Sequence, residues 1–354
     1  MLPASILPIG YFFLPLLISW VLTAGFLRLG PRIGLVDEPN VRKVHTQRTP
    51  RGGGLAIYVA LAISALLFSS AREGEAIRIL GLGLVIVLLG LFDDLHPLPW
   101  QLRLGVQTAV AVAAVISLPI HAGWYIQVGA VLWIVGLTNA FNMLDNMDAL
   151  SAGVAWIVAG LLGAARLLRS GEGGDGWEGT MLSLAFMGAL TGFLWFNWPP
   201  ARIFMGDAGS TFLGFFLGVS SLEMNVEHGL VPQRLGAALC ILAVPWYDLA
   251  SVVALRVWQG RSPFHADKQH LSHRLVQLGL KSPIAVRVIY LLGLASGVSG
   301  LLLDDVSPSG AILVGVQLAC WWLAIAIIEY LGHYCSGWPA PGSGESGIRT
   351  RGEV

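Results

Sequence analysis

Eleven long apolar runs dominate the chain and limit how it can fold. A helix that crosses the hydrocarbon core of a bilayer needs about 20 mostly apolar residues. The runs cover residues 6–29, 53–71, 77–92, 104–120, 124–141, 150–168, 179–197, 209–222, 233–257, 285–303 and 310–332. Lipid offers no partners to backbone polar groups, so such runs fold as helices. We therefore predict an all-α integral membrane protein with about 11 transmembrane helices.

Composition agrees with a membrane protein. Of the 354 residues, 55% are hydrophobic and 12% are charged, about half the charged fraction of a soluble domain. Lys plus Arg and Asp plus Glu both number 21, so overall charge predicts no nucleic-acid partner. The three cysteines suggest neither a disulfide framework nor a metal cluster. The first run continues to Leu27 without a basic start or an obvious cleavage site, which favours a retained span over a signal peptide.

Loop charge predicts the orientation. If the N-terminus lies outside, segments 30–52, 93–103, 139–149, 198–208, 258–284 and 332–354 share the cytoplasmic side and carry most of the loop Lys and Arg. The opposite segments carry Arg72, Arg78, Arg166, Arg169 and Arg234. This imbalance favours an external N-terminus and a cytoplasmic C-terminus. We expect one membrane domain over 1–332 and a disordered Gly/Ser-rich cytoplasmic tail over 333–354.

Four polar clusters lie at the predicted cytoplasmic ends of the runs. They are LFDDLHPLP with Asp93 and Asp94, NAFNMLDNMDAL with Asn139, Asn142, Asp145 and Asp148, RIFMGDAGS with Asp207, and FHADKQHLSHRL with His270, His273 and Arg274. Each alone could be a solvated helix end, a helix cap or a basic loop. Together they predict one polar site on the cytoplasmic face.

Local patterns indicate how these clusters fold. Pro97 and Pro99 should end a helix early and leave Asp93 and Asp94 in a turn. The spacing of three places Asn139, Asn142, Asp145 and, less closely, Asp148 along one helical stripe. The segment before GDAGS reads as a strand-like approach, followed by a glycine turn and a helix N-terminus.

The combined residue types indicate phosphate chemistry. Several carboxylates with an asparagine and no thiolate suit a hard cation such as Mg²⁺, held by protein oxygens and substrate phosphates. His270 and His273 could ligate zinc, but the cations around them favour contact with phosphate or nucleotide. Arg103, the histidines and Arg274 would neutralise phosphate oxygens, as phosphoryl transfer requires. At a membrane surface, the substrates would be a lipid phosphate and a soluble nucleotide.

The motifs and their order resemble the polyprenyl-phosphate N-acetylhexosamine-1-phosphate transferases, of the glycosyltransferase family 4 type. The resemblance runs from GLVDEPNVRKVHTQRTPRGGGLAIY at 34–58 to DKQHLSHRL and favours the branch that uses UDP-GlcNAc and undecaprenyl phosphate. It implies Mg²⁺, with Mn²⁺ able to substitute, and a cytoplasmic active site in the bacterial plasma (inner) membrane. The implied partners are a UDP-N-acetylhexosamine, polyprenyl phosphate and membrane lipid, with UMP released. A homodimer is compatible with it.

The resemblance also implies residue roles. Asp93 and Asp94 match paired acids, one of which deprotonates the lipid phosphate or acts as nucleophile, and Asp207 matches a catalytic metal ligand. Asn142 matches an asparagine on or near that metal. The predicted substrate-binding residues are Lys43, Arg48, Arg103, Asn139, Asp145, Asp148, His270, His273 and Arg274.

Two positions depart from the family pattern. In its DGxDG element glycine follows each aspartate, whereas this chain has Asn146 and Ala149. Asn146 could keep a turn with positive φ, and Ala149 would fit if its position were helical. Asp248 is a further acid within an apolar run, and we expect it to orient a histidine or arginine of the following loop.

Three other functions compete with this interpretation. One is the phospho-MurNAc-pentapeptide translocase of peptidoglycan synthesis, whose histidine run differs from HLSHRL. An ion-coupled transporter is another, but its acids would lie near the membrane midplane. The third, a membrane metallohydrolase, would consume nucleotide without added lipid.

Overall fold

The computed structural model describes residues 7–37, 48–68, 74–118, 120, 123–170, 177–226, 232–262, 269–304 and 306–335. These ranges fold almost entirely as helix. The α-helices are α1 (Leu7–Leu29), α2 (Gly53–Phe68), α3 (Gly74–Leu95), α4 (Trp100–Ser117), α5 (Trp124–Leu144), α6 (Leu150–Ser170), α7 (Trp177–Asn197), α8 (Gly206–Val226), α9 (Pro232–Ile241), α10 (Ala243–Trp258), α11 (Leu271–Gln277), α12 (Ser282–Leu301) and α13 (Pro308–Cys335). The other elements are η1 (Gly30–Arg32), η2 (Leu302–Asp304), β1 (Val36–Asp37) and β2 (Thr49–Pro50).

The all-α membrane class is confirmed. Each of the eleven predicted runs contains a helix. Of the helices in the described ranges, 8 are long and apolar enough to cross a membrane, or up to 9 if α9 and α10 form one span. Helix α2 has 16 residues and α8 carries several polar side chains, so these two are outside that set. The number of crossings and the orientation of the termini stay predictions.

The run at 233–257 differs from the single helix that we predicted. It folds as α9 and α10, which meet at an angle of 76° beside Leu242. Pro245 lies in the first turn of α10 and has no N–H to donate to a carbonyl of the preceding turn. The chain can therefore bend here without losing that hydrogen bond.

The predicted turn at Asp93 and Asp94 is also wrong. Both residues lie in the last turn of α3, and the backbone N–H of His96 still donates to the carbonyl of Phe92. Pro97 ends the helix only after these residues, because proline clashes most with the turn that precedes it. Both carboxylates thus project from a helix rather than from a loop.

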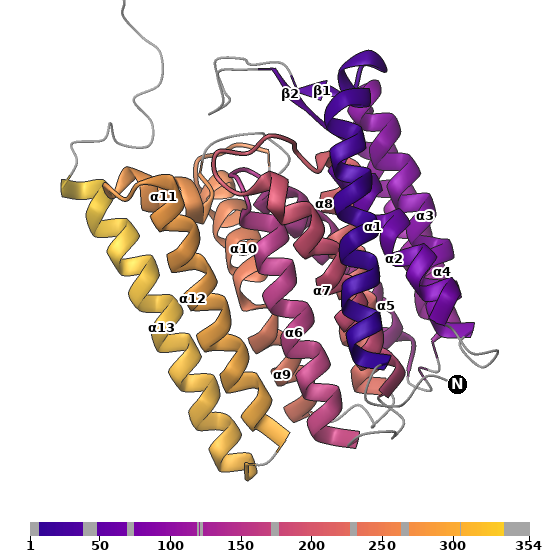
Figure 1. Cartoon of the computed structure of the whole chain (residues 1–354). Helices are drawn as coiled ribbons and strands as arrows, with labels where there is room; N and C mark the ends of the chain where they lie inside the picture. Colours follow the sequence, from indigo (N-terminus) through magenta and orange to yellow (C-terminus); the bar gives the residue numbers. More distant parts are fainter. Residues whose placement is uncertain are drawn as a thin grey trace, which may run out of the picture.

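Helices α7 and α8 form the centre of the bundle. Their buried rings, which include Phe186, Phe193, Phe212 and Phe216, pack against apolar side chains of neighbouring helices. In contrast, α13 and the outer face of α5 expose large apolar side chains such as Leu313 and Leu132, as expected of surfaces in contact with lipid. Figure 1 shows β1, β2 and α11 at one end of the bundle and the start of α1 at the other.

Close helix contacts set the position of α8. A Cβ at Gly54 in α2 would collide with the backbone of Gly209 in α8, and a Cβ at Gly90 in α3 would lie 2.5 Å from the Cα of Ala208. Since glycine has no side chain, α2 and α3 can approach the first turn of α8 at backbone distance. This approach brings the end of α3 against the start of α8.

The segment before α8 has the strand-like form that the sequence indicates. The N–H of Phe204 donates to the carbonyl of Pro50, and the N–H groups of Gly53 and Gly54 donate to the carbonyls of Phe204 and Met205. Strands β1 and β2 pair antiparallel just before this contact, with Val36 opposite Pro50. Gly206 then turns the chain with φ of 75°.

Some predictions fall outside the described ranges. Lys43 lies in 38–47, and the start of the motif FHADKQHLSHRL lies in 263–268. Helix α13 continues to Cys335, past the predicted boundary between membrane domain and tail at 332, and the rest of the tail is outside the description.

Candidate active site

Arg103 joins two of the predicted catalytic acids. Its Nη1 lies 2.6 Å from Oδ2 of Asp93 and 3.3 Å from Oδ2 of Asp207. Asp93 comes from the end of α3, Arg103 from the start of α4 and Asp207 from the start of α8. Three elements that are separate in sequence therefore contribute to one charged cluster, as predicted.

Arg51 forms a second bridge, which our sequence analysis missed. Its Nη1 lies 2.8 Å from Oδ1 of Asp94, and its Nη2 pairs with Asp37 of β1. We counted Arg51 only as loop charge and did not single out Asp37. The available signal was the position of Arg51 directly before the glycines that begin α2, because such glycines let a chain approach neighbouring backbone closely.

Asp94 caps α8. Its Oδ1 accepts from the N–H of Asp207 at 3.1 Å, and its Oδ2 accepts from the N–H of Ala208 at 3.2 Å. A carboxylate at a helix N-terminus satisfies N–H groups that have no partner within the helix. Glycine is needed at Gly206, since a Cβ there would collide with the Asp94 carboxylate.

The acids differ in accessibility. The side chains of Asp93 and Asp94 are 6% and 2% exposed, whereas that of Asp207 is 34% exposed. Asp93 is further occupied by the N–H of Leu98, which lies 2.6 Å from its Oδ1. Of these three predicted catalytic carboxylates, Asp207 is the one open to a ligand.

The two asparagines of α5 have different neighbours. Asn142 Oδ1 accepts from the Ser210 hydroxyl at 3.0 Å, which places Asn142 beside the first turns of α8. Asn139 Nδ2 donates to Gln107 Oε1 and to the carbonyl of Val135, each at 2.8 Å. These contacts attach α5 to α8 and α4, with Asn142 next to the acid cluster and Asn139 engaged in helix packing.

The prediction that Asp145 and Asp148 continue one helical stripe with the two asparagines is wrong. Both aspartates lie in the turn between α5 and α6, because α5 ends at Leu144. Asp145 is half-buried, and its burial, together with repulsion from Asp94, raises its pKa to about 7. Asp94 acts on Asp145 across the site, so the turn belongs to the same electrostatic cluster. Asp148 Oδ2 accepts from the N–H of Ala201 at 2.9 Å, which fixes the turn to the segment before α8.

Our prediction for the two missing glycines is wrong. Among non-glycine residues in the described ranges, Ala149 alone has positive φ, at 61°. Its N–H donates to Asn197 and its carbonyl accepts from the Tyr290 hydroxyl. These contacts hold alanine in a conformation that favours glycine. Asn146 instead donates to the Met143 carbonyl.

Helix α11, which holds His273 and follows His270, contacts the turn between α5 and α6. Ser272 donates to Asn146 Oδ1 at 2.5 Å. His270 Nδ1 lies 2.8 Å from Asp248 Oδ2, which confirms the prediction that Asp248 pairs with a histidine or an arginine of the following segment. Asp248 is fully buried. Since an ionised carboxylate only accepts, Nδ1 carries the proton and Nε2 is the ring nitrogen left for another partner.

The remaining predicted substrate-binding residues vary in position. The His273 ring lies 6.4 Å from the His270 ring, and Arg48 is exposed next to β2. Arg274 is buried and its contacts are with α10 and α13 rather than with the acid cluster. The roles of these residues stay predictions, as does that of Lys43.

The residues present fit a hard divalent cation. Four carboxylates, those of Asp37, Asp93, Asp94 and Asp207, gather around the guanidinium groups of Arg51 and Arg103. No group of three or more metal-ligating His, Cys, Asp or Glu side chains occurs within the described ranges. Mg²⁺ does not require such a cage, because it usually binds through one or two carboxylates plus substrate phosphates.

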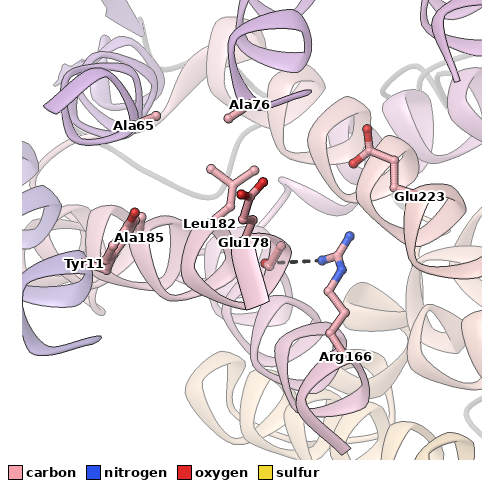
Figure 2. Close-up of a pocket in the computed structure, with 9 residues that line it drawn as sticks. Tyr11, Ala65, Ala76, Arg166, Glu178, Leu182, Ala185 and Glu223 are labelled. Atoms are coloured by element: carbon pink, nitrogen blue, oxygen red, sulfur yellow. Dashed lines mark hydrogen bonds between the residues drawn. The ribbon is translucent and has the colours of Figure 1, made fainter. Parts of the chain in front are cut away.

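A pocket at the other end of the bundle is separate from this cluster. Figure 2 shows Arg166, Glu178 and Glu223 around it, with Tyr11 and Leu182 nearby. Ala76 at the start of α3 and Glu223 at the end of α8 line it, whereas the acids lie at the opposite ends of these two helices. We therefore do not include it in the candidate site.

Comparison with known proteins identifies the family. The sequence model of glycosyl transferase family 4 matches residues 76–225. A "Probable undecaprenyl-phosphate N-acetylglucosaminyl 1-phosphate transferase" of Bacillus subtilis is 33% identical over 339 residues, which cover 90% of this chain and 88% of the relative. The chain belongs to glycosyl transferase family 4.

Other family 4 members are similar over most of the chain. A "Decaprenyl-phosphate N-acetylglucosaminephosphotransferase" of Mycolicibacterium smegmatis is 33% identical, with 78% of this chain and 77% of the relative covered. An "Undecaprenyl-phosphate alpha-N-acetylglucosaminyl 1-phosphate transferase" of Thermotoga maritima is 30% identical, with 73% and 78% covered. The resemblance predicted from the motifs is therefore confirmed at the level of the family.

Proposed function

We propose that this family 4 protein transfers N-acetylglucosamine-1-phosphate from UDP-GlcNAc to a polyprenyl phosphate such as undecaprenyl phosphate and releases UMP. The observation that carries the proposal is the similarity to the Bacillus subtilis transferase over 90% of the chain. The clustered acids and arginines at one end of the bundle support it, since phosphoryl transfer depends on positioning and charge neutralisation.

The proposed reaction is a phosphoryl transfer, in which one phosphorus–oxygen bond forms and another breaks. An oxygen of the lipid phosphate attacks the sugar-linked phosphorus of UDP-GlcNAc. The bond from that phosphorus to the bridging oxygen breaks, and UMP leaves with the electron pair. Arg103 and Arg51 are placed to exchange carboxylate partners for phosphate oxygens, because guanidinium groups bind both in the same planar geometry. His270, through Nε2, would contact the nucleotide or the diphosphate.

The exposures suggest a division of roles among the acids. Asp207 would meet the substrates and, with Asn142, hold Mg²⁺, which would supply positive charge to the phosphate oxygens. Mn²⁺ could take its place. Asp93 and Asp94 would position Arg103, Arg51 and the start of α8. In this scheme both aspartates act through other groups of the site.

The proposal extends to the protein's cellular location and pathway. We place the protein in the bacterial plasma membrane with this site on the cytoplasmic face, where UDP-sugars are made. Its product would start the assembly of a cell-envelope polysaccharide on the lipid. The homodimer stays a prediction.

A transfer assay tests the proposal. Membranes that contain the protein are incubated with undecaprenyl phosphate, Mg²⁺ and radiolabelled UDP-GlcNAc, or with a panel of other UDP-sugars. UMP and the mass of the extracted lipid product are measured. We expect a lipid diphosphate-GlcNAc product and at least about a 100-fold lower rate for Asp207→Asn.

Arginine variants supply the matched control. Arg103→Gln should lose most of the activity, whereas Arg202→Gln, at an exposed position at the same end of the bundle, should retain it. Nucleotide release without added lipid would indicate a hydrolase. Transfer only from UDP-MurNAc-pentapeptide would indicate the translocase, and the absence of turnover with any donor would favour a transporter.

A further inference from the structure

One buried acid stands out on the last helix. Helix α13 is so exposed that none of the most apolar stretch of its candidate span is buried, yet Glu329, the last residue of that span, is 8% exposed. An acid at membrane depth is costly unless it faces protein and has a partner. The position of Glu329 therefore requires an explanation within the bundle.

Glu329 binds residues of two other helices. Its Oε2 accepts from the Tyr247 hydroxyl of α10 at 3.0 Å, and its Oε1 lies 3.1 Å from Nε of Arg274 in α11. The Tyr247 ring also stacks on Trp322 of α13, with ring centroids 4.4 Å apart. Arg274 Nη2 donates to the Ser251 hydroxyl of α10 at 2.7 Å. Glu329 and Arg274 thus tie α10, α11 and α13 together.

The same helices hold His270. Asp248 follows Tyr247 in α10 and binds the His270 ring, and it also accepts from the N–H of Leu271 at 2.6 Å. Arg274 lies one helical turn after His270. The Asp248 and Glu329 contacts therefore fix α11 at two points, its N-cap and Arg274 at the middle of the helix.

Helix α11 depends on such contacts for its position. It has only 7 residues, and isolated helices shorter than about 12 residues are unstable in water. An ion pair buried on both sides, with Arg274 at 5% and Glu329 at 9% side-chain exposure, is well shielded from solvent. Removal of one partner leaves a buried charge alone, which strongly destabilises the local structure.

We propose that Glu329 is a positioning residue for His270. Through Arg274 it holds α11 against α10, so that Asp248 can orient the His270 ring and Ser272 can contact the turn at Asn146. The role in donor binding rests on the function proposed above, whereas the effect on α11 does not. The competing explanation is that Glu329 only attaches α13 to the bundle.

Glu329→Ala in the full-length purified protein tests the structural step first. Hydrogen exchange should accelerate in peptides covering 271–277, and Glu329→Gln, which keeps a hydrogen-bond acceptor, should restore part of the protection. The matched control is Gln317→Ala, an exposed polar position on the same helix. Unchanged exchange in 271–277 for Glu329→Ala would overturn the proposal, whatever the enzyme's substrate.

Kinetics then tests the link to His270. We expect Glu329→Ala to raise KM for UDP-GlcNAc about tenfold, the effect of roughly one lost polar contact, with less change in kcat and in KM for the lipid. In a His270→Ala background, Glu329→Ala should have little further effect. An effect of equal size in both backgrounds would show that Glu329 acts independently of His270 and would refute the proposal. If the Glu329 variants change hydrogen exchange as expected but the wild type shows no turnover, the proposed function fails while the positioning of α11 stands.

Discussion

At the scale of residues, the site contains similar carboxylates in different environments. Asp94 is almost fully buried and uses both oxygens to cap α8, whereas Asp207, at the same junction, keeps a third of its side chain exposed. An oxygen that already accepts backbone hydrogen bonds is less able to bind a ligand. In the proposed function, Asp207 therefore contacts the substrates and Asp94 aligns the start of α8.

Asp145 should make stability depend on pH. Burial and Asp94 raise its pKa to about 7 in the folded protein, while an unfolded aspartate titrates near about 4. Between these values the folded state holds a proton that the unfolded state has released, so this contribution to stability falls as pH rises. The asparagine side chain in Asp145→Asn does not titrate. Its Tm relative to wild type should therefore increase from about pH 4 to pH 7 and then level off.

Thermal unfolding in detergent at several pH values measures this difference. The wild type and Asp145→Asn are compared in the same buffers, so that titration of other groups cancels. A Tm difference that stays constant across the range would contradict the raised pKa of Asp145.

At the scale of elements, the site exists because helices meet at small residues. Gly54 and Gly90 let α2 and α3 approach the start of α8 at backbone distance. This approach places Asp94 within hydrogen-bond distance of the N–H groups of Asp207 and Ala208. The arrangement of the acids therefore depends on the close packing of α2, α3 and α8.

Gly54→Ala should destabilise the protein. The added methyl group would collide with the backbone of Gly209, which has no flexible side chain to move away. Overpacking of this kind costs about 1–3 kcal/mol, and the shift of α8 should also lower activity. The matched control is Gly81→Ala in α3, where an added Cβ meets nothing within 4 Å. Equal Tm values for the two variants would contradict the close α2–α8 contact.

At the scale of the whole molecule, the site elements share one end of the bundle. The ends of α3 and α5, the starts of α4 and α8, and the short α11 are joined by the contacts described above. Figure 1 shows α11 at the same end as β1 and β2. A lipid phosphate at the membrane surface and a soluble nucleotide could both reach this end.

Cysteine labelling tests the predicted orientation. In a background with the native cysteines changed to serine, Arg202→Cys lies at the site end and Trp124→Cys, at the start of α5, lies at the other; both positions are exposed. A membrane-impermeant maleimide applied to intact cells should label only Trp124→Cys. Arg202→Cys should react after permeabilisation, and the reverse pattern would reject a cytoplasmic site.

The sequence by itself determined the membrane class, the positions of most helices and most of the polar residues of the site. Apolar runs identify helices because every backbone polar group in lipid must bond within its own segment. Even for Asp248, its position in an apolar run predicted a histidine or arginine partner, and the structure shows His270.

Only the tertiary structure decided which partners these residues have. Several contacts join positions that are far apart in the chain: the bridges of Arg51 and Arg103, the cap formed by Asp94 and the pairing of Arg274 with Glu329. The positive φ of Ala149 likewise depends on Asn197 and Tyr290, which come from other helices. Periodicity records which residues share a face of one helix. It carries no information on which helices meet, because that depends on the packing of side chains across the bundle.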